Sequence, residues 1–334
     1  MKKAIVLFNL GGPENLKDVY SFLLKFFSDP AIIPYPKIIR KMIAFFIATF
    51  RRKKSENIYR QLGGGSPLLK NTQDQAEALQ KVLGKGYKVF VAMRYTKPFI
   101  SDTLAEIKEY LPDQIVLLPL YPHFSTTTTG SSFLEWDFQK NKQKMARPEN
   151  RICCYPQQEG FIEALLDLTL RELKEFSSLP RILFSAHGLP IRIVEAGDPY
   201  VFHVELTFKK LVQRLNESIK EDIDAVLCYQ SRVGPAQWTG PSLDEEIERA
   251  GRDTKPVLVV PLSFVNEHSE TLVELDIDFK NQAETLGIPK YGRVPTVSCH
   301  PLFINGLAEL IHSKENVWIT CSVGLKKCCR RQNS

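Results

Sequence analysis

One histidine in this sequence stands directly behind a predicted buried strand. Residues 181–184 form an apolar run, and His187 and Gly188 follow within four residues. In open α/β sheets, ligands bind outside the carboxyl ends of the strands, and glycine allows close approach of the backbone. An imidazole at such a place can accept a proton near neutral pH or bind a metal ion. A single histidine is also often structural, so both interpretations stay open from this position alone.

A row of acidic residues follows another predicted strand. Residues 261–278 leave a strand end and then take a helical pattern, with Glu270, Glu274 and Asp278 at positions i, i+4 and i+8. This spacing puts the three carboxylates on one side of a helix, where like charges repel by a few tenths of a kcal/mol per pair. His268 and Glu270 near the helix start supply imidazole and carboxylate ligands that suit Fe²⁺. The pattern predicts either a solvated acidic surface or a path for protons or a cation.

The elements that must position these groups alternate along the chain. Short apolar runs are separated by amphipathic stretches, which predicts βαβ units and mostly parallel sheets. The predicted buried strands are residues 4–8, 87–93, 114–118, 181–184, 225–229 and 257–260. By themselves, these features describe an α/β protein with a histidine and carboxylates at a strand-end cleft, and a metal-dependent hydrolase fits that description equally well.

The two halves of the chain also resemble each other. Residues 6–9 match residues 182–185 at an offset of 176, and residues 116–120 match residues 258–262 at an offset of 142. We therefore predict the same α/β unit used twice. The fall in offset places about 34 extra residues in the first half, within residues 29–66, which have no counterpart in the second half.

That extra piece contains the most apolar helical stretch of the chain. Residues 38–50 are almost entirely apolar, and the densest basic cluster, residues 51–54, lies beside them. The stretch predicts either a buried core helix or an exposed apolar lip that admits an apolar substrate or touches a membrane surface. The flanking basic residues favour the lip.

Composition narrows the class of protein. The chain has 334 residues and a net charge of +6, without the concentrated basic and aromatic patch that is typical of nucleic-acid binding. No apolar run reaches the roughly 18 residues of a membrane span, and the run that ends at Asn9 is predicted to be a buried strand and not an export signal. The cysteines number seven, an odd count, so we expect reduced thiols and a bacterial cytoplasmic location.

Seven motifs resemble those of ferrochelatases, and they occur in the family's order between residue 4 and about residue 312. Each motif is short, but seven in order form a specific pattern. They are residues 9–14 (NLGGPE), 63–68 (GGGSPL), 93–95 (MRY), 121–132 (YPHFSTTTTGSS), 183–190 (LFSAHGLP), 228–235 (CYQSRVGP) and 267–272 (EHSETL).

The resemblance implies an α/β fold of two Rossmann-like domains with parallel sheets, related by internal duplication, and a porphyrin cleft. It implies insertion of Fe²⁺ into protoporphyrin IX to form protohaem, with release of two protons. The expected divisions are a first domain at 1–160 with the lip at about 29–66, a second domain at 161–290, a C-terminal helix at 291–315 that packs back on the first domain, and a basic tail at 316–334.

The resemblance also implies roles for particular residues. His187 and Glu270 are expected to bind iron and to remove protons, and the assignment of these two roles between the two residues stays open. His268, Glu274 and Asp278 are expected along the path for protons and iron. The residues expected to line the porphyrin pocket are Leu10, Arg94, Tyr95, Tyr121 and Trp238. For each of these five, plain packing or a surface salt bridge is the alternative.

Leu10 occupies a position that varies with porphyrin type. An apolar residue there resembles the protoporphyrin enzymes, whereas the coproporphyrin enzymes tend to carry tyrosine. A chelatase that loads cobalt or nickel into another tetrapyrrole is a further alternative, but such relatives have histidine at both strand ends, and Leu10–Gly11 stands at the first. A porphyrin or haem carrier without catalysis is the remaining alternative, and the presence of both His187 and Glu270 counts against it.

The tail carries cysteines that resemble those of [2Fe–2S]-containing ferrochelatases. Cys321, Cys328 and Cys329 match one bacterial spacing. Such a cluster needs four thiolates, and Thr126 stands where one family position has the internal cysteine, so Cys153 or Cys154 would have to replace it. We therefore expect a tail with reduced thiols in preference to a cluster. No nucleic-acid partner is expected, and the lip predicts peripheral contact with the inner membrane.

Overall fold

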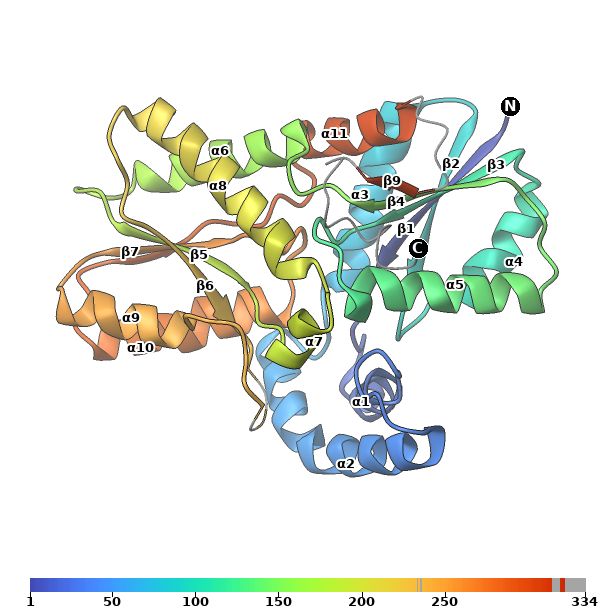
Figure 1. The fold of residues 1–334 in the computed structure, drawn as a ribbon, viewed down its shortest axis with the longest axis horizontal. Coiled ribbons are helices and arrows are strands. Elements are labelled where there is room, and N and C mark those ends of the chain that lie inside the picture. Colours follow the sequence, from blue (N-terminus) through green and yellow to red (C-terminus); the bar gives the residue numbers. More distant parts are fainter. Residues whose placement is uncertain (233, 235, 314–318, 322–334) are drawn as a thin grey trace. The chain divides into compact units, whose positions relative to one another are not determined.

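The computed structural model describes residues 1–232, 234, 236–313 and 319–321 (Figure 1). The chain forms two compact units, one of Met1–Cys154 with Ala308–Cys321, and one that includes Tyr155–Leu307. The division expected at residues 160, 290 and 315 stays a prediction. Among the described residues, no helix has the length and apolar character that spanning a membrane requires.

The first unit is built on a parallel sheet of five strands in the order β2-β1-β3-β4-β9. Residues 4–8 of its first strand, β1, are completely buried, as expected for a parallel strand covered on both faces. Its strands are β1 (Lys3–Asn9), β2 (Tyr87–Met93), β3 (Gln114–Pro119), β4 (Glu149–Cys154) and β9 (Ile319–Cys321). Its helices are η1 (Leu16–Asp18), α1 (Val19–Phe27), α2 (Lys37–Gln61), α3 (Leu68–Leu83), α4 (Ile100–Tyr110), the π-helix η2 (Thr126–Gly130) and α5 (Ser131–Lys142).

The second unit has a parallel sheet of four strands in the order β6-β5-β7-β8. Its strands are β5 (Arg181–His187), β6 (Ala225–Gln230), β7 (Val257–Pro261) and β8 (Tyr291–Arg293). Its helices are α6 (Glu159–Leu173), α7 (Ile191–Glu195), α8 (Tyr200–Ile219), α9 (Leu243–Arg252), the π-helix η3 (Glu270–Phe279) and α10 (Lys280–Thr285). Helix α11 (Pro301–His312) contributes residues to both units.

The two sheets repeat one topology, which confirms the predicted duplicated α/β fold. The first strand of each unit, β1 or β5, has the second strand of that unit on one side and the third on the other, and each third strand, β3 or β7, leads into a π-helix. The strand registers differ by one residue from the two sequence matches taken together: Phe8 pairs with Pro119 and Ser185 pairs with Pro261, so an offset of 142 between β3 and β7 goes with an offset of 177, and not 176, between β1 and β5. These strands are apolar on both faces, so no alternation of side chains marks their register in the sequence.

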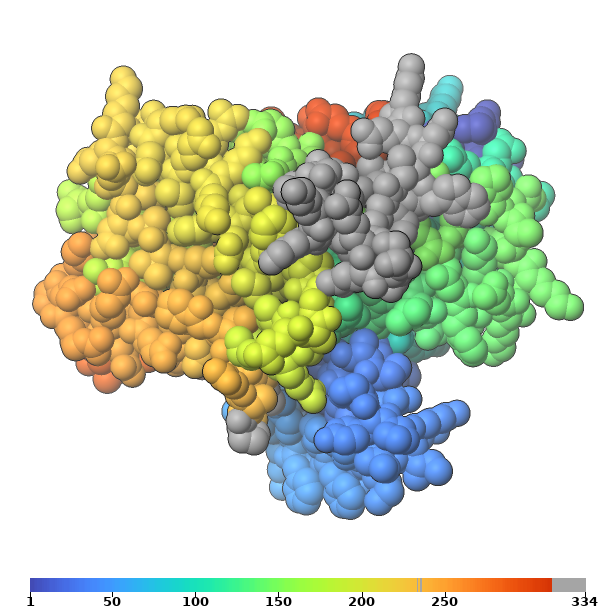
Figure 2. All heavy atoms as spheres, in the orientation of Figure 1, coloured from blue at the N-terminus to red at the C-terminus, as the bar shows by residue number. Residues whose placement is uncertain are grey.

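Helix α2 lies inside the predicted insertion and exposes much of its apolar surface. Ala44 and Ala48 are fully buried, whereas several large side chains on the helix are at least 48% exposed. These are Ile38, Ile39, Met42, Phe45, Phe46 and Phe50. The interpretation as a buried core helix is therefore wrong for most of this face, and these exposed side chains have the character expected of an apolar lip. Residues 37–61 belong to the blue part of the surface in Figure 2.

Candidate functional site

His187 is the last residue of β5, at the carboxyl end of the second sheet. Strand β6 lies on one side of β5, and β7 and then β8 lie on the other, so the connections that leave β5 and β7 run in opposite directions. Ligands bind at such switch points in open α/β sheets. The His187 side chain is 41% exposed, and the backbone behind it is tightly packed because a Cβ on Gly188 would lie 3.0 Å from the Gln230 carbonyl oxygen.

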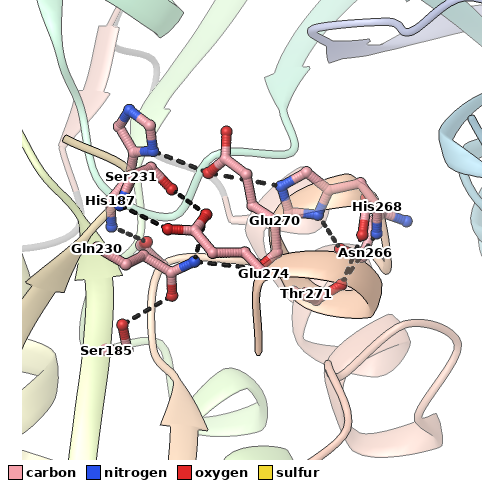
Figure 3. A network of polar contacts seen from close by, with 10 residues as sticks. Ser185, His187, Gln230, Ser231, Asn266, His268, Glu270, Thr271 and Glu274 are labelled. Carbon is pink, nitrogen blue, oxygen red and sulfur yellow. Dashed lines mark hydrogen bonds and ion pairs between the residues drawn. The ribbon is translucent and has the colours of Figure 1, made fainter. Parts of the chain in front are cut away.

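The structure joins His187 to the π-helix η3. Its Nδ1 atom lies 2.8 Å from Oε2 of Glu270, the first residue of η3 (Figure 3). His268 Nε2 lies 3.9 Å from the same oxygen. The Nδ1 atom of His268 lies 3.0 Å from the carbonyl oxygen of Asn266, which can only accept, so this nitrogen carries the proton.

His187 and Glu270 shift each other's protonation. Burial alone raises the pKa of Glu270, but the charge and hydrogen bond of His187 outweigh burial and lower that pKa to about 2. Burial disfavours the protonated form of His187, but the Glu270 carboxylate outweighs this effect and raises the His187 pKa above its ordinary value. With no cation nearby, the pair therefore favours an imidazolium that donates to a carboxylate.

Glu274 has the opposite electrostatic character. Burial, followed by repulsion from Glu270, raises the pKa of Glu274 to about 7, even though Ser231 and Gln230 donate to it. The Ser231 N–H donates to Oε1 at 2.9 Å, and its hydroxyl donates to Oε2 at 2.5 Å. Gln230 Nε2 donates to Oε2 at 3.2 Å. Glu274 can therefore gain or lose a proton close to neutral pH.

Gln230 and Ser231 were not among the predicted site residues. Gln230 ends β6 and lies beside His187 in the β5–β6 register. Its side-chain oxygen accepts from the Ser185 hydroxyl at 2.7 Å, which orients its amide toward Glu274 and toward the Glu270 carbonyl oxygen at 3.0 Å. The sequence could have identified them, because both residues directly follow the predicted strand 225–229. His187 was selected by the same criterion, its position at the end of a predicted strand.

Asp278 is separated from this network. Residues 270–279 form a π-helix, with i→i+5 hydrogen bonds in place of the regular helix that the sequence pattern predicted. Asp278 is exposed near its far end. Besides Glu270 and Glu274, Asp276 of η3 makes partly buried contacts, because it pairs with Arg293. The assignment of Asp278 to a proton or iron path stays a prediction.

Arg94 and Tyr95 lie in the first unit and share one buried carboxylate. Arg94 Nη2 donates to Asp29 Oδ2 at 2.7 Å, and the Tyr95 hydroxyl donates to the same oxygen at 2.8 Å. Ser131 also donates its hydroxyl to this oxygen. A pocket of about 490 Å³ borders Asp29, Arg94 and Tyr95. Asp29 thus neutralises the Arg94 guanidinium, and the expected roles of Arg94 and Tyr95 in the porphyrin pocket stay predictions.

The other predicted pocket residues are distributed over both units. Leu10 packs at the edge of an apolar cluster of the first unit. Tyr121 lies two residues after the end of β3, and burial raises the pKa of its hydroxyl. Trp238 lies in the second unit, and its ring atom Cε3 would lie 3.3 Å from a Cβ on Gly188, directly behind His187. Their roles in porphyrin binding stay predictions.

The tail cysteines that resemble [2Fe–2S] ligands lie largely outside the described residues. Cys328 and Cys329 lie outside the described residues, and only the backbone of Cys321 is described, in β9. That backbone is in register with Cys154 of β4. Within the described part of the chain, no three histidine, cysteine or acidic side chains are grouped so that they could hold a metal ion.

The duplicated parallel sheets, with a histidine and carboxylates at a strand end, define a chelatase-type α/β protein. Two solved structures share this fold: SirB from Bacillus subtilis with Fe³⁺ is 12% identical, with a TM-score of 0.55 and coverage of 93% of this chain and 94% of that chain. The cobalt complex of the sirohydrochlorin chelatase SirB is also 12% identical, with a TM-score of 0.51 and coverage of 92% and 93%. At this identity, the likeness concerns the fold alone.

The sequence comparisons are more specific. The ferrochelatase family profile matches residues 2–315. A ferrochelatase of Rickettsia bellii is 47% identical, with coverage of 98% of this chain and 92% of that protein. A ferrochelatase of Pelagibacter ubique is 41% identical, with coverage of 98% of each chain. The chain belongs to the ferrochelatase family, whose members are metal-chelating lyases.

Proposed function

We propose that this chain inserts Fe²⁺ into protoporphyrin IX to form protohaem, the last step of haem biosynthesis, and releases two protons. The observation that carries the proposal is the contact of 2.8 Å between His187 and Glu270, with Glu274 in the same polar network. Insertion requires groups that take protons from two pyrrole nitrogens and groups that attract a dication. The network offers both kinds of group in one place.

The proton steps use the opposed electrostatics of the carboxylates. Glu270 is held ionised by His187, so it attracts Fe²⁺ without having to lose a proton. The charge of the arriving dication opposes the positive charge on His187, which favours loss of the imidazolium proton to solvent through the exposed part of the ring. The neutral imidazole can then take a pyrrole proton or bind iron. Glu274, with a pKa of about 7, can accept a proton and pass it to water.

The porphyrin is proposed to be protoporphyrin because Leu10 is apolar. Its place at the edge of an apolar cluster supports contact with apolar ring substituents. A parallel assay with coproporphyrin III tests this choice. Faster metallation of coproporphyrin than of protoporphyrin would assign the chain to the coproporphyrin enzymes. If the chain inserts cobalt into a more reduced tetrapyrrole and metallates neither porphyrin, it belongs with the other chelatases.

The test of the reaction is anaerobic incubation of the purified chain with Fe²⁺ and protoporphyrin IX, followed by the loss of porphyrin fluorescence. We expect wild-type protein to form haem, and His187→Ala and Glu270→Gln to lower kcat by at least about 100-fold. His300→Ala is the matched control, because His300 Nε2 makes the same kind of contact, 2.8 Å from Asp167 Oδ2, elsewhere in the second unit. It should keep nearly full activity.

The carrier alternative makes a different prediction. If wild-type protein binds protoporphyrin but metallates neither it nor coproporphyrin III, the protein is a carrier and the proposed reaction is wrong. If the His300 variant loses as much activity as the His187 variant, the loss reflects general damage and not the site.

The exposed face of α2 supports peripheral contact with the inner membrane of a bacterial cell. Phe46 is 52% and Phe50 80% exposed, and residues 51–54 add basic groups beside them. Such a surface favours an anionic membrane interface. We expect binding to liposomes that contain anionic lipid at low salt, and loss of binding in Phe46→Ser/Phe50→Ser. Leu134→Ser/Phe138→Ser on α5, which removes two equally exposed apolar side chains, is the control. Absence of liposome binding by wild-type protein excludes this contact.

A further inference from the structure

The edge strand β8 holds the π-helix η3 through two side chains. Tyr291 and Arg293 are two residues apart, so they point to the same face of the strand. The Tyr291 hydroxyl donates to the Leu275 carbonyl oxygen at 2.8 Å. Arg293 donates to both carboxylate oxygens of Asp276, from Nε at 2.8 Å and from Nη2 at 2.5 Å. This two-pronged contact fixes orientation as well as distance.

The same guanidinium reaches the segment in front of the π-helix. Arg293 Nη1 donates to Glu267 Oε1 at 2.7 Å, and the backbone N–H of Thr296 donates to that oxygen at 2.8 Å. Glu267 stands three residues before Glu270 in the sequence. One arginine side chain, only 11% exposed, thus holds the chain on both sides of the stretch from Glu270 to Glu274.

A π-helix needs such support more than an α-helix does. Its i→i+5 hydrogen bonds are rare in proteins and usually occur as single turns, frequently at functional sites. Here the π-helical stretch spans ten residues. Catalytic side chains must also be held within about 0.5 Å of their working positions by residues that do not themselves react. Arg293 donates three side-chain hydrogen bonds to acids on or next to η3, namely Asp276 and Glu267. Among the hydrogen bonds of the described residues, none joins Arg293 to the site residues themselves.

We propose that Arg293 is a positioning residue for iron insertion, which holds η3 so that Glu270 and Glu274 face His187. The inference rests on the proposed function. Its physical basis is the arginine fork, which matches the Asp276 carboxylate and leaves Nη1 for Glu267. Lysine can supply the charge but not the fork.

The test compares Arg293→Met and Arg293→Lys with Arg181→Met. Arg181 is a matched control because it also bridges two acids, Asp224 at 3.0 Å and Asp253 at 2.8 Å, and is 5% exposed. It starts β5, so it lies at the opposite end of that strand from His187.

We expect Arg293→Met to lower kcat for haem formation by about ten-fold or more, with the KM for porphyrin close to the wild-type value, since residues that orient reacting groups commonly carry effects of this size. Arg293→Lys should recover part of kcat. Arg181→Met should lower the melting temperature but leave kcat unchanged. Amide hydrogen exchange across residues 270–279 should speed up in the Arg293 variants and not in the Arg181 variant.

Other outcomes are equally informative. If wild-type protein forms no haem, the proposed function fails. In that case, unchanged hydrogen exchange across η3 in Arg293→Met also shows that Arg293 does not hold the π-helix. If wild-type protein is active and Arg293→Met keeps its kcat, or loses no more than Arg181→Met, the inference is wrong. Should Arg293→Met fail to fold, Asp276→Asn and Tyr291→Phe each remove one part of the contact, and a normal kcat in both also contradicts the proposal.

Discussion

Ser231 donates two hydrogen bonds to Glu274, one from its backbone N–H to Oε1 at 2.9 Å and one from its hydroxyl to Oε2 at 2.5 Å. It does so from a left-handed backbone conformation, with φ at 64°. A residue with a side chain is strained there by about 1–2 kcal/mol. Strain of this kind clusters at functional sites, where the surrounding structure maintains it.

This geometry distinguishes two substitutions at Ser231. Both Ser231→Ala and Ser231→Gly remove the hydroxyl donor, so both should lower the rate of haem formation to a similar extent. Only glycine relieves the backbone strain, so we expect the glycine variant to be about 1 kcal/mol more stable than the alanine variant in urea denaturation. Equal stability of the two variants would show that the left-handed conformation carries no strain.

Glu274 should make stability fall as pH rises. The unfolded chain loses this proton near pH 4.5, whereas the folded chain holds it until about pH 7 because of burial and the Glu270 charge. Between these values the folded state binds more protons, so the free energy of unfolding decreases with rising pH, by about 3 kcal/mol at most. Glu274→Gln lacks this decrease. Urea midpoints at pH 5 and pH 8 should therefore differ more for wild type than for the variant, and an equal difference in both contradicts the raised pKa.

The Asp29 carboxylate should be a major contributor to stability in the first unit. It is 2% exposed and pairs with Arg94, so Asp29→Ala leaves a guanidinium without its partner. Breaking a buried pair in this way costs about 3–5 kcal/mol. Asp74→Ala on α3 is the control, because the partner Lys70 is 72% exposed and such pairs contribute about 1 kcal/mol or less. Similar denaturation midpoints for the two variants would contradict the importance of the Asp29 network.

The cysteine tail gives a chemical prediction. We expect protein purified without oxygen to contain no acid-labile sulfide and to react with a thiol reagent in its denatured state at all seven cysteines. Equal amounts of bound iron and sulfide, lost in Cys321→Ser, would instead establish a [2Fe–2S] cluster. The register of Cys154 with Cys321 makes Cys154→Ser the next variant in that case.

Local patterns in the sequence predicted the parts of the site that depend on single strands. The apolar run before His187 placed this residue at a strand end, and the same criterion applied to residues 225–229 would have found Gln230 and Ser231. The alternation of strands and helices predicted parallel sheets, because buried parallel strands are continuous apolar runs, and the matched segments of the two halves predicted that one unit is used twice.

Three features required the tertiary structure. The register of the duplicated strands differs by one residue from the sequence match, because strands buried on both faces carry no alternating pattern. Residues 270–279 form a π-helix, which a spacing of four residues does not distinguish from an α-helix. The apolar segment 38–50 has the composition of a core helix, and only its surroundings decide that most of its large side chains are exposed.

The sequence alone therefore determined the fold class, the strand-end histidine and the family resemblance, since each depends on residues that are neighbours in the chain. The pairing of His187 with Glu270 joins residues 83 positions apart in the sequence. The hydrogen bonds of Arg293 join strand β8 to the same π-helix, η3. The tertiary structure decided these contacts, because the pKa of a carboxylate and the position of a helix depend on groups that folding alone brings near.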